Sequence, residues 1–147
     1  MIETHIYQAA DIPVLKKRSL IIAFLHTHLE QYGDLPEDIE KAFDYAMQKG
    51  NADGGFVAVT KSDNHLVGVA IVNKTGMNGY IPENILVYIA THKDYRGKGI
   101  ATALMNEVIL AAEGNIALHV EHDNPAIRLY EKFGFTNKYL EMRLQKN

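Results

Sequence analysis

A helix start without acidic residues is the feature of this chain that most constrains its fold. The run 95–102 (YRGKGIAT) follows an apolar stretch and opens a helical pattern, yet its charged residues are Arg96 and Lys98. The first turn of a helix exposes unpaired N–H groups and a partial positive charge, so acidic side chains are favoured there. Cations at this place make sense where an external anion binds those N–H groups. Gly97 and Gly99 allow the backbone to approach such an anion closely. The run therefore predicts a strand–loop–helix unit that binds a phosphate or pyrophosphate.

The length and charge of the chain limit the classes of protein to which it can belong. With 147 residues, 47% of them hydrophobic, we expect one domain spanning residues 1–147. The formal net charge of −3 argues against a basic surface for nucleic acid. The first residues lack the pattern of a signal peptide, and no apolar run approaches the ~20 residues of a membrane span. A cytoplasmic protein that contacts neither nucleic acid nor membrane is expected.

The chain contains no cysteine. This excludes disulfides, cysteine-ligated zinc and every mechanism through a cysteine acyl-enzyme. The seven histidines show no ligand spacing, since His26 and His28 are two residues apart on a predicted helix and point in different directions. We therefore expect no metal site.

Hydrophobic periodicity predicts an α/β (α+β) protein with the element order β-α-α-β-β-β-α-β-α-β. We expect a mixed, mostly antiparallel sheet with a central β-α-β unit, which contains the anion-binding run. The predicted strands cover residues 2–8, 55–60, 66–72, 85–91, 116–121 and 137–144. The predicted helices cover 11–31, 36–48, the stretch from the 96–101 loop to 113, and 124–133.

Three glycine-rich phosphate motifs compete for the run 95–102. The Walker pattern fails because His92 stands where its first glycine belongs. The dinucleotide pattern has Thr102 in place of its third glycine, and too few residues follow Glu121 for further βαβ units. The pattern R/Q-x-x-G-x-G/A fits, with Arg96, Gly99 and Ala101 in its fixed positions.

A second motif lies one predicted helix and one strand further along. Residues 124–135 fit the pattern N-x-A-x-x-x-Y-x-x-x-G-F. With both motifs in this order, the chain resembles the GNAT superfamily of acetyl-CoA-dependent N-acetyltransferases over nearly all of its 147 residues.

The resemblance implies acetyl-CoA as acyl donor and assigns residues to it. The pyrophosphate is expected on the backbone N–H groups of Arg96, Gly97, Lys98, Gly99, Ile100, Ala101 and Thr102. The pantetheine arm is expected beside Ile89, Ala90 and Thr91, where family strands splay and expose backbone groups. Asn124, which caps the predicted helix 124–133, is expected to contact the cofactor as well.

Acetyl transfer from a thioester to an amine needs a neutral amine, a stabilised carbonyl oxygen and a protonated thiolate. Because no cysteine is present, direct attack in a ternary complex is the simplest mechanism. The resemblance implies Tyr130 as the acid that protonates the thiolate. Glu83 is the first candidate base, and Glu121, His122 or water are its rivals.

Several alternatives remain open at this point. A non-catalytic acyl-CoA-binding regulatory module on the same fold would carry both motifs. A nucleotide-binding protein of another fold would carry only the glycine-rich run 95–102. The acceptor is open among small amines, amino acids, peptide N-termini and lysine side chains. A homodimer is also open, because the predicted strand 137–144 offers an edge to a partner.

Overall fold

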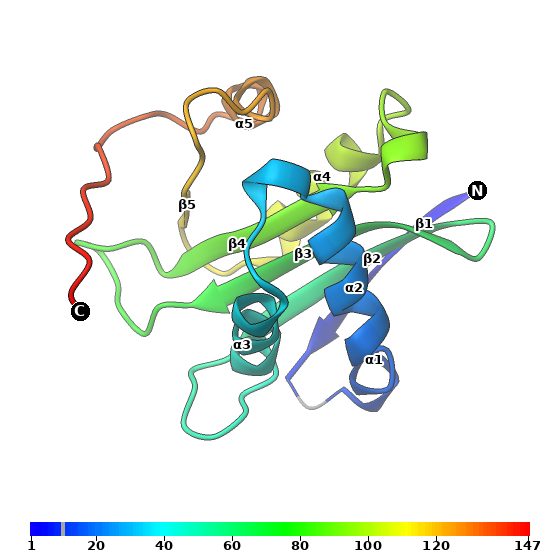
Figure 1. Ribbon diagram of the computed structural model, residues 1–147, viewed down its shortest axis with the longest axis horizontal. Coiled ribbons are helices and arrows are strands. Elements are labelled where there is room, and N and C mark those ends of the chain that lie inside the picture. Colours follow the sequence, from blue (N-terminus) through cyan, green and yellow to red (C-terminus); the bar gives the residue numbers. More distant parts are fainter. Residues whose placement is uncertain (10) are drawn as a thin grey trace.

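The computed structural model describes residues 1–9 and 11–147 and shows a five-stranded sheet with helices on both faces (Figure 1). The strands are β1 (Ile2–Gln8), β2 (Gly55–Ser62), β3 (His65–Lys74), β4 (Asn84–Thr91) and β5 (Ile116–Leu118). The helices are α1 (Ile12–Leu15), α2 (Arg18–His28), α3 (Pro36–Ala46), α4 (Ile100–Ala111) and α5 (Ile127–Lys132), with short 3-10 helices η1 (Glu30–Tyr32) and η2 (Lys93–Tyr95).

The strands follow one another across the sheet in the order β1-β2-β3-β4-β5. The first four pair antiparallel, whereas β4 and β5 run parallel and are joined through α4. The turn between β2 and β3 places Asp63 and Asn64 at φ 49° and 71°. Two central residues with positive φ match the twist of a hairpin, and they fix the pairing of Ser62 with His65.

Both faces of the sheet are covered, which explains why β2 and β3 are apolar almost throughout. Helices α2 and α3 cover one face and α4 the other (Figure 1). Val57 and Val59 of β2 pack in the cluster that includes Ile21 and Phe43 from α2 and α3. The alternate residues Phe56 and Ala58 pack in the second cluster, which includes Leu104 of α4. The sheet thus lies between two cores, and α4 belongs to the second.

The predicted helix 11–31 is wrong as a single element. It is divided into α1 and α2 around Lys16 and Lys17, and η1 follows separately. Arg18, the first residue of α2, donates to both carboxylate oxygens of Asp44 on α3 at 2.9 Å each. This pairing fixes where α2 begins, and helical periodicity alone carries no signal for it.

The predicted strand 137–144 is also wrong for the single chain, because residues 136–147 form neither helix nor strand. The predicted strand 116–121 shortens to β5, whose pairing with β4 ends at Leu118. The predicted helix 124–133 begins later, at Ile127, with Ala126 rather than Asn124 as its N-cap residue. The Asn124 Oδ1 accepts the N–H of Ala126 at 2.9 Å and so stabilises the turn before the helix.

Candidate active site

The divergence of β4 and β5 creates the central cavity of the molecule. The two strands pair from Asn84 opposite Ile116 to Leu86 opposite Leu118, and β4 then continues to Thr91 without β5 beside it. A cavity of about 920 Å³ opens at this divergence, and every residue from 85 to 91 lines it. Successive side chains of a strand point to opposite faces, so a cavity that touches each residue in turn touches the backbone edge. This edge presents N–H and C=O groups to a ligand.

A β-bulge lies where the strands diverge. Ile71 of β3 pairs with Tyr88 and Val72 pairs with Leu86, which leaves Val87 opposite no residue of β3. A bulge interrupts the ladder and turns backbone groups away from it. Here it turns the β4 backbone at a residue that lines the cavity.

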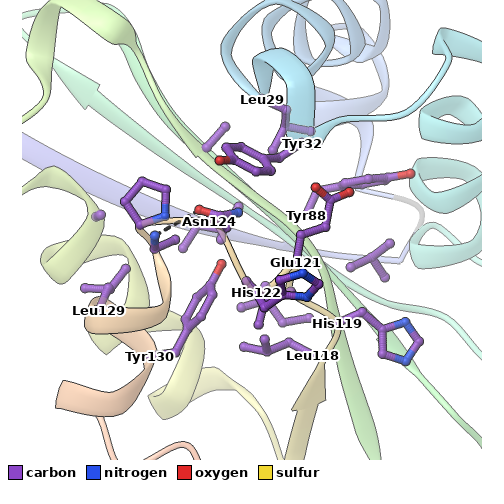
Figure 2. A pocket seen from close by; sticks show the side chains of 18 of the residues that line it. Leu29, Tyr32, Tyr88, Leu118, His119, Glu121, His122, Asn124, Leu129 and Tyr130 are labelled. Atoms are coloured by element: carbon purple, nitrogen blue, oxygen red, sulfur yellow. Dashed lines mark hydrogen bonds between the residues drawn. The ribbon is translucent and has the colours of Figure 1, made fainter. Parts of the chain in front are cut away.

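Tyr130 forms part of one wall of this cavity. Its ring packs edge-on against Phe135, with centroids 5.9 Å apart, and 9% of the residue is exposed. Figure 2 shows its hydroxyl directed into the cavity, near Asn124. Burial raises the pKa of Tyr130 to about 12, so the hydroxyl stays protonated at neutral pH and can donate a proton or a hydrogen bond.

The opposite side of the cavity carries acidic and aromatic side chains. Figure 2 shows Glu121, His122 and Tyr88 across the cavity from Tyr130. The Tyr88 hydroxyl donates to Asp34 at 2.5 Å, and burial together with this bond raises the pKa of Tyr88 far above its ordinary value. Asp34 and Glu121 both line the cavity and give this side a negative character. Such a wall suits a cationic amine.

The structure places Glu83 away from the residues that line this cavity. Its Oε2 accepts the N–H of Gly79 at 3.1 Å, and its Oε1 accepts the N–H of Asn115 at 2.7 Å. These backbone hydrogen bonds, that from Asn115 first, hold the pKa of Glu83 below its usual range. Glu83 therefore ties the loop after β3 to the residue before β5, and the structure does not bring it together with Tyr130.

Residues 96–99, called the glycine loop below, border a second, smaller hollow of about 210 Å³. The hollow is lined by Thr91, Tyr95, Arg96, Gly97, Gly99, Ile100, Ala101 and Thr102. Gly97 and Gly99 have φ of 76° and 81°, a conformation that other residues rarely adopt. Apart from the two residues bonded to each glycine, no described residue has an atom within 4 Å of where a Cβ would stand, so the backbone is open to a ligand. Lys98 does not line the hollow, and its Nζ lies 5.3 Å from the centre of the Tyr95 ring.

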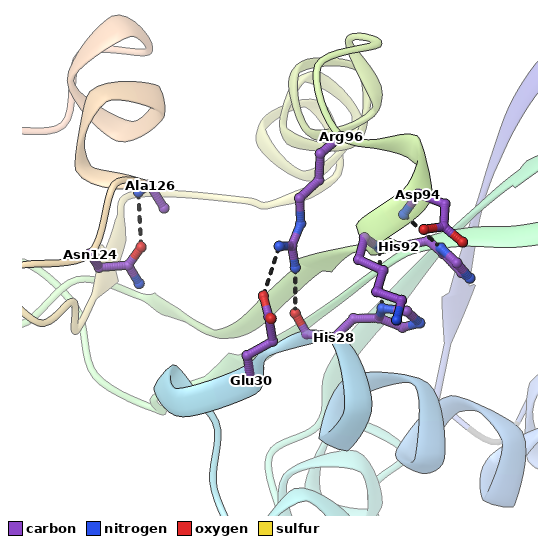
Figure 3. A network of polar contacts seen from close by, with 8 residues as sticks. His28, Glu30, His92, Asp94, Arg96, Asn124 and Ala126 are labelled. Carbon is purple, nitrogen blue, oxygen red and sulfur yellow. Dashed lines mark hydrogen bonds and ion pairs between the residues drawn. The ribbon is translucent and has the colours of Figure 1, made fainter.

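Arg96 joins the glycine loop to the end of α2. Its guanidinium donates to Glu30 at 2.7 Å and to the carbonyl oxygen of His28 at 2.9 Å (Figure 3). Tyr32 donates to the carbonyl oxygen of Asp123 at 3.2 Å. Through these bonds η1 is linked both to the loop before α4, at Arg96, and to the loop before α5, at Asp123.

His28 lies against the glycine loop. Burial, then the neighbouring His92, Arg96 and Lys93, hold the pKa of His28 below its ordinary value, so the charged form of the ring is disfavoured there. The ring packs against His92, tilted by 35° with centroids 4.2 Å apart, and its Nδ1 accepts the N–H of Lys93 at 3.2 Å. The positive character of the loop therefore comes from Arg96, Lys98 and backbone N–H groups.

Several residues of the cavity were not found from the sequence. Tyr32, Asp34 and Tyr88 belong to no motif, and they meet because η1 lies over β4. The alternation of side chains along β4 could have indicated that Tyr88 faces α2 and α3, but nothing in the sequence pairs it with Asp34.

The parallel strands that diverge, the glycine loop that opens α4 and the buried tyrosine on α5 lie together around one cavity. Residues 19–135 match the model of the acetyltransferase (GNAT) family, and the chain belongs to this family. The prediction from the two sequence motifs is confirmed. The family uses acetyl-CoA as its acetyl donor.

Comparisons of the whole structure give the same fold. A ribosomal-protein-alanine N-acetyltransferase from Brucella melitensis biovar Abortus 2308 is 17% identical, with a TM-score of 0.68 over 99% of each chain. A predicted acetyltransferase from Clostridium acetobutylicum, solved with acetyl-CoA, is 17% identical, with a TM-score of 0.69 over 97% of this chain and 96% of that one. At this identity the likeness shows the fold alone.

A curated relative matches a shorter stretch. The cysteine-rich protein 2-binding protein of Mus musculus is 38% identical over 60 residues, which are 40% of this chain and 8% of the relative. The match therefore covers a small part of the relative's own length. In the part of the chain that the structure describes, no helix is long and apolar enough to cross a membrane.

Proposed function

We propose that this protein transfers the acetyl group of acetyl-CoA to a primary amine by direct attack while both substrates are bound. The observation that carries the proposal is the divergence of β4 and β5, with the glycine loop beside it and the Tyr130 hydroxyl in the cavity. The family's use of acetyl-CoA supports the choice of donor, and the cavity offers space for a donor and an acceptor.

The donor would be held mainly by backbone. The N–H groups of residues 96–102 meet an anion at the start of α4, where the helix carries a partial positive charge. The exposed edge of β4 at Ile89, Ala90 and Thr91 offers hydrogen bonds to the amides of the pantetheine arm. Asn124 lines the same cavity and remains a proposed contact.

Tyr130 is the proposed acid. The amine nitrogen attacks the thioester carbonyl carbon, the C–S bond breaks, and the departing thiolate takes the proton of the Tyr130 hydroxyl. With a pKa of about 12, Tyr130 holds its proton until it is needed. A second group must accept the proton that the amine loses.

We assign the role of proton acceptor to Glu121. Its carboxylate lines the cavity, whereas both oxygens of Glu83 are engaged by backbone N–H groups outside it. The lowered pKa of Glu83 makes it a weaker base as well. His122 also lines the cavity and is a rival proton acceptor.

A pair of matched substitutions tests these roles. Release of free thiol from acetyl-CoA is followed with a panel of amines, and Glu121→Gln is compared with Glu83→Gln for the best acceptor. Both changes preserve shape and remove one charge. We expect Glu121→Gln to lower kcat by about 10²-fold, the usual contribution of a general base, and Glu83→Gln to leave kcat nearly unchanged. The reverse pattern contradicts the assignment.

The main competing function is a regulatory module that binds acyl-CoA without catalysis. It predicts that acetyl-CoA raises the melting temperature but that no amine in the panel releases thiol. The acidic side of the cavity at Asp34 and Glu121 favours catalysis on a cationic amine. Small amines, amino acids, peptide N-termini and lysine side chains all satisfy this condition.

A further inference from the structure

Glu30 has a backbone conformation that a residue of its type rarely adopts. It follows Leu29, the C-cap of α2, and its φ is 55°. Glycine is the usual residue in this left-handed conformation after a helix, because a residue with a Cβ is strained there. Strain of this kind persists only where the surrounding contacts enforce it. Glu30 lines the cavity, so the contacts that enforce its conformation also shape the site.

The strongest of these contacts is made by Arg96. Its Nη1 donates to Glu30 Oε1 at 2.7 Å, and its Nη2 donates to the carbonyl oxygen of His28 at 2.9 Å (Figure 3). The carbonyl groups in the last turn of a helix lack helical partners and carry a partial negative charge. One guanidinium therefore binds the end of α2 and the carboxylate that follows it.

Arg96 also lies at the boundary between the two cavities. Thr91, Arg96 and Ala101 are the described residues that line both the large cavity and the hollow at the glycine loop. Of these three side chains, that of Arg96 is the charged one. It starts at the loop where the donor anion is proposed to bind, and it ends on η1 (Figure 3). The proposed donor side and η1 are thus linked through one side chain.

The short helix η1 leads to two residues of the cavity wall. Tyr32 ends η1, Asp34 follows two residues later, and both line the cavity. The backbone N–H of Tyr32 donates to Leu29 at 3.0 Å, and that of Gly33 donates to Glu30 at 3.3 Å. These bonds join residues only three positions apart. A segment this short depends on its side-chain contacts for a fixed position, and the ion pair is one of them.

We propose that Glu30 is a positioning residue for the amine acceptor, which acts by joining η1 to Arg96 of the glycine loop. The proposal rests on the proposed acetyl transfer. With η1 held in this way, Tyr32 and Asp34 keep their places in the wall that meets the amine. The donor is proposed to bind backbone N–H groups, so loss of the pair affects the amine more than acetyl-CoA. The Glu30 and Arg96 side chains are 51% and 47% exposed, which limits the size of the effect.

Two substitutions of Glu30 separate positioning from folding. Glu30→Gln removes the charge and keeps a strained residue, whereas Glu30→Gly removes the carboxylate and relieves the strain. Each should raise KM for the best amine about fivefold, while kcat and the Kd for acetyl-CoA stay within about twofold of the wild type. Glu30→Gly should keep the Tm of the wild type or raise it. A variant that folds as well and binds the amine less well has lost positioning, not stability.

Gln48→Gly is the matched control. Gln48 follows Met47, the C-cap of α3, its φ is 61°, and it does not line the cavity. The same relief of strain at this place should leave KM for the amine unchanged. A Glu30→Gln variant with the amine KM of the wild type would overturn the proposal. A rise in the Kd for acetyl-CoA as large as the rise in amine KM would overturn it as well.

Amide hydrogen exchange tests the position of η1 without turnover. Glu30→Gln should speed exchange of the Tyr32 N–H about fivefold. It should not change exchange of the Gln48 N–H, which donates to the Tyr45 carbonyl oxygen at 3.0 Å at the end of α3. Unchanged exchange at Tyr32 in an active enzyme would overturn the positioning role alone. A wild type that releases no thiol with any amine would contradict the proposed function, and with it the role of Glu30 toward the amine.

Discussion

Replacing Tyr130 with phenylalanine deletes one hydroxyl from the cavity and leaves the ring packing in place. The ring keeps its contact with Phe135, and burial raises the pKa of Tyr130. The free energy of unfolding should therefore change by no more than about 1 kcal/mol. If the hydroxyl is the acid that protonates the thiolate, kcat should fall by about 10²–10⁴-fold, equivalent to roughly 2.7–5.4 kcal/mol of activation free energy.

Three measurements separate catalysis from binding and folding. Thiol release at saturating acetyl-CoA gives kcat, calorimetry gives the Kd for acetyl-CoA, and thermal unfolding gives Tm. We expect only kcat to change. Tyr45→Phe is a matched control, because the Tyr45 hydroxyl donates to the carbonyl oxygen of Lys74 at 2.6 Å, and Tyr45 does not line the cavity. This control should lose about 1 kcal/mol of stability and keep its kcat.

The pH dependence of the wild type gives a second check. A tyrosine with an ordinary pKa of about 10 is ~10% ionised at pH 9, whereas Tyr130, with a pKa of about 12, is almost fully protonated there. Tyr130 should therefore remain able to donate its proton, and kcat should not fall through its ionisation, up to about pH 11. A kcat for Tyr130→Phe within about threefold of the wild type would refute the assigned role, as would a wild-type kcat that falls with an apparent pKa near 10.

Two further predictions concern the donor site and the helices. Gly99→Ala should raise the Kd for acetyl-CoA at least about tenfold, because φ is 81° and a Cβ would stand in the anion site. Gly50→Ala, at φ 69° with equally open surroundings, should lower Tm about as much as Gly99→Ala does but leave the Kd for acetyl-CoA unchanged. Equal changes of Kd in the two variants, measured by calorimetry, would contradict the prediction. Arg18→Met should cost about 1 kcal/mol at pH 7. Arg18 holds the pKa of Asp44 below its ordinary value, so this stabilisation is present above that value and lost as pH falls through the lowered pKa. Urea unfolding at pH 7 and at successively lower pH should show the difference between wild type and variant shrink as Asp44 takes up its proton, and a difference that does not shrink would refute the role of the pair.

The central β-α-β unit was predictable because its signals are local. Gly97 and Gly99 are required by the positive φ of the loop itself. Outside this unit, the signal is local as well: Asp63 and Asn64 adopt the positive φ that suits the twist of the β2–β3 hairpin. The continuous apolar run 66–72 predicts β3, and it follows from burial on both faces of the sheet. The sequence carries such signals wherever neighbouring residues decide the structure.

The remaining features depend on contacts between distant residues. Asp34 meets Tyr88 only because η1 lies over β4. Glu83 precedes β4 as expected, but the N–H groups of Gly79 and Asn115 engage its carboxylate, and neither of them is marked by a motif. The alternation in 137–144 predicts a strand that the structure does not form, because a strand also needs a neighbouring edge with which to pair.

The divergence of β4 and β5 has a consequence for how such a protein can change over time. A binding edge made of peptide groups does not depend on which side chains the strand carries. Under the proposed function, Ile85 to Thr91 could therefore be exchanged for other residues of similar shape without loss of the donor. Selection for a new acceptor could then act on Tyr32, Asp34 and Glu121, and an engineer could redesign one half of the proposed site while keeping the other.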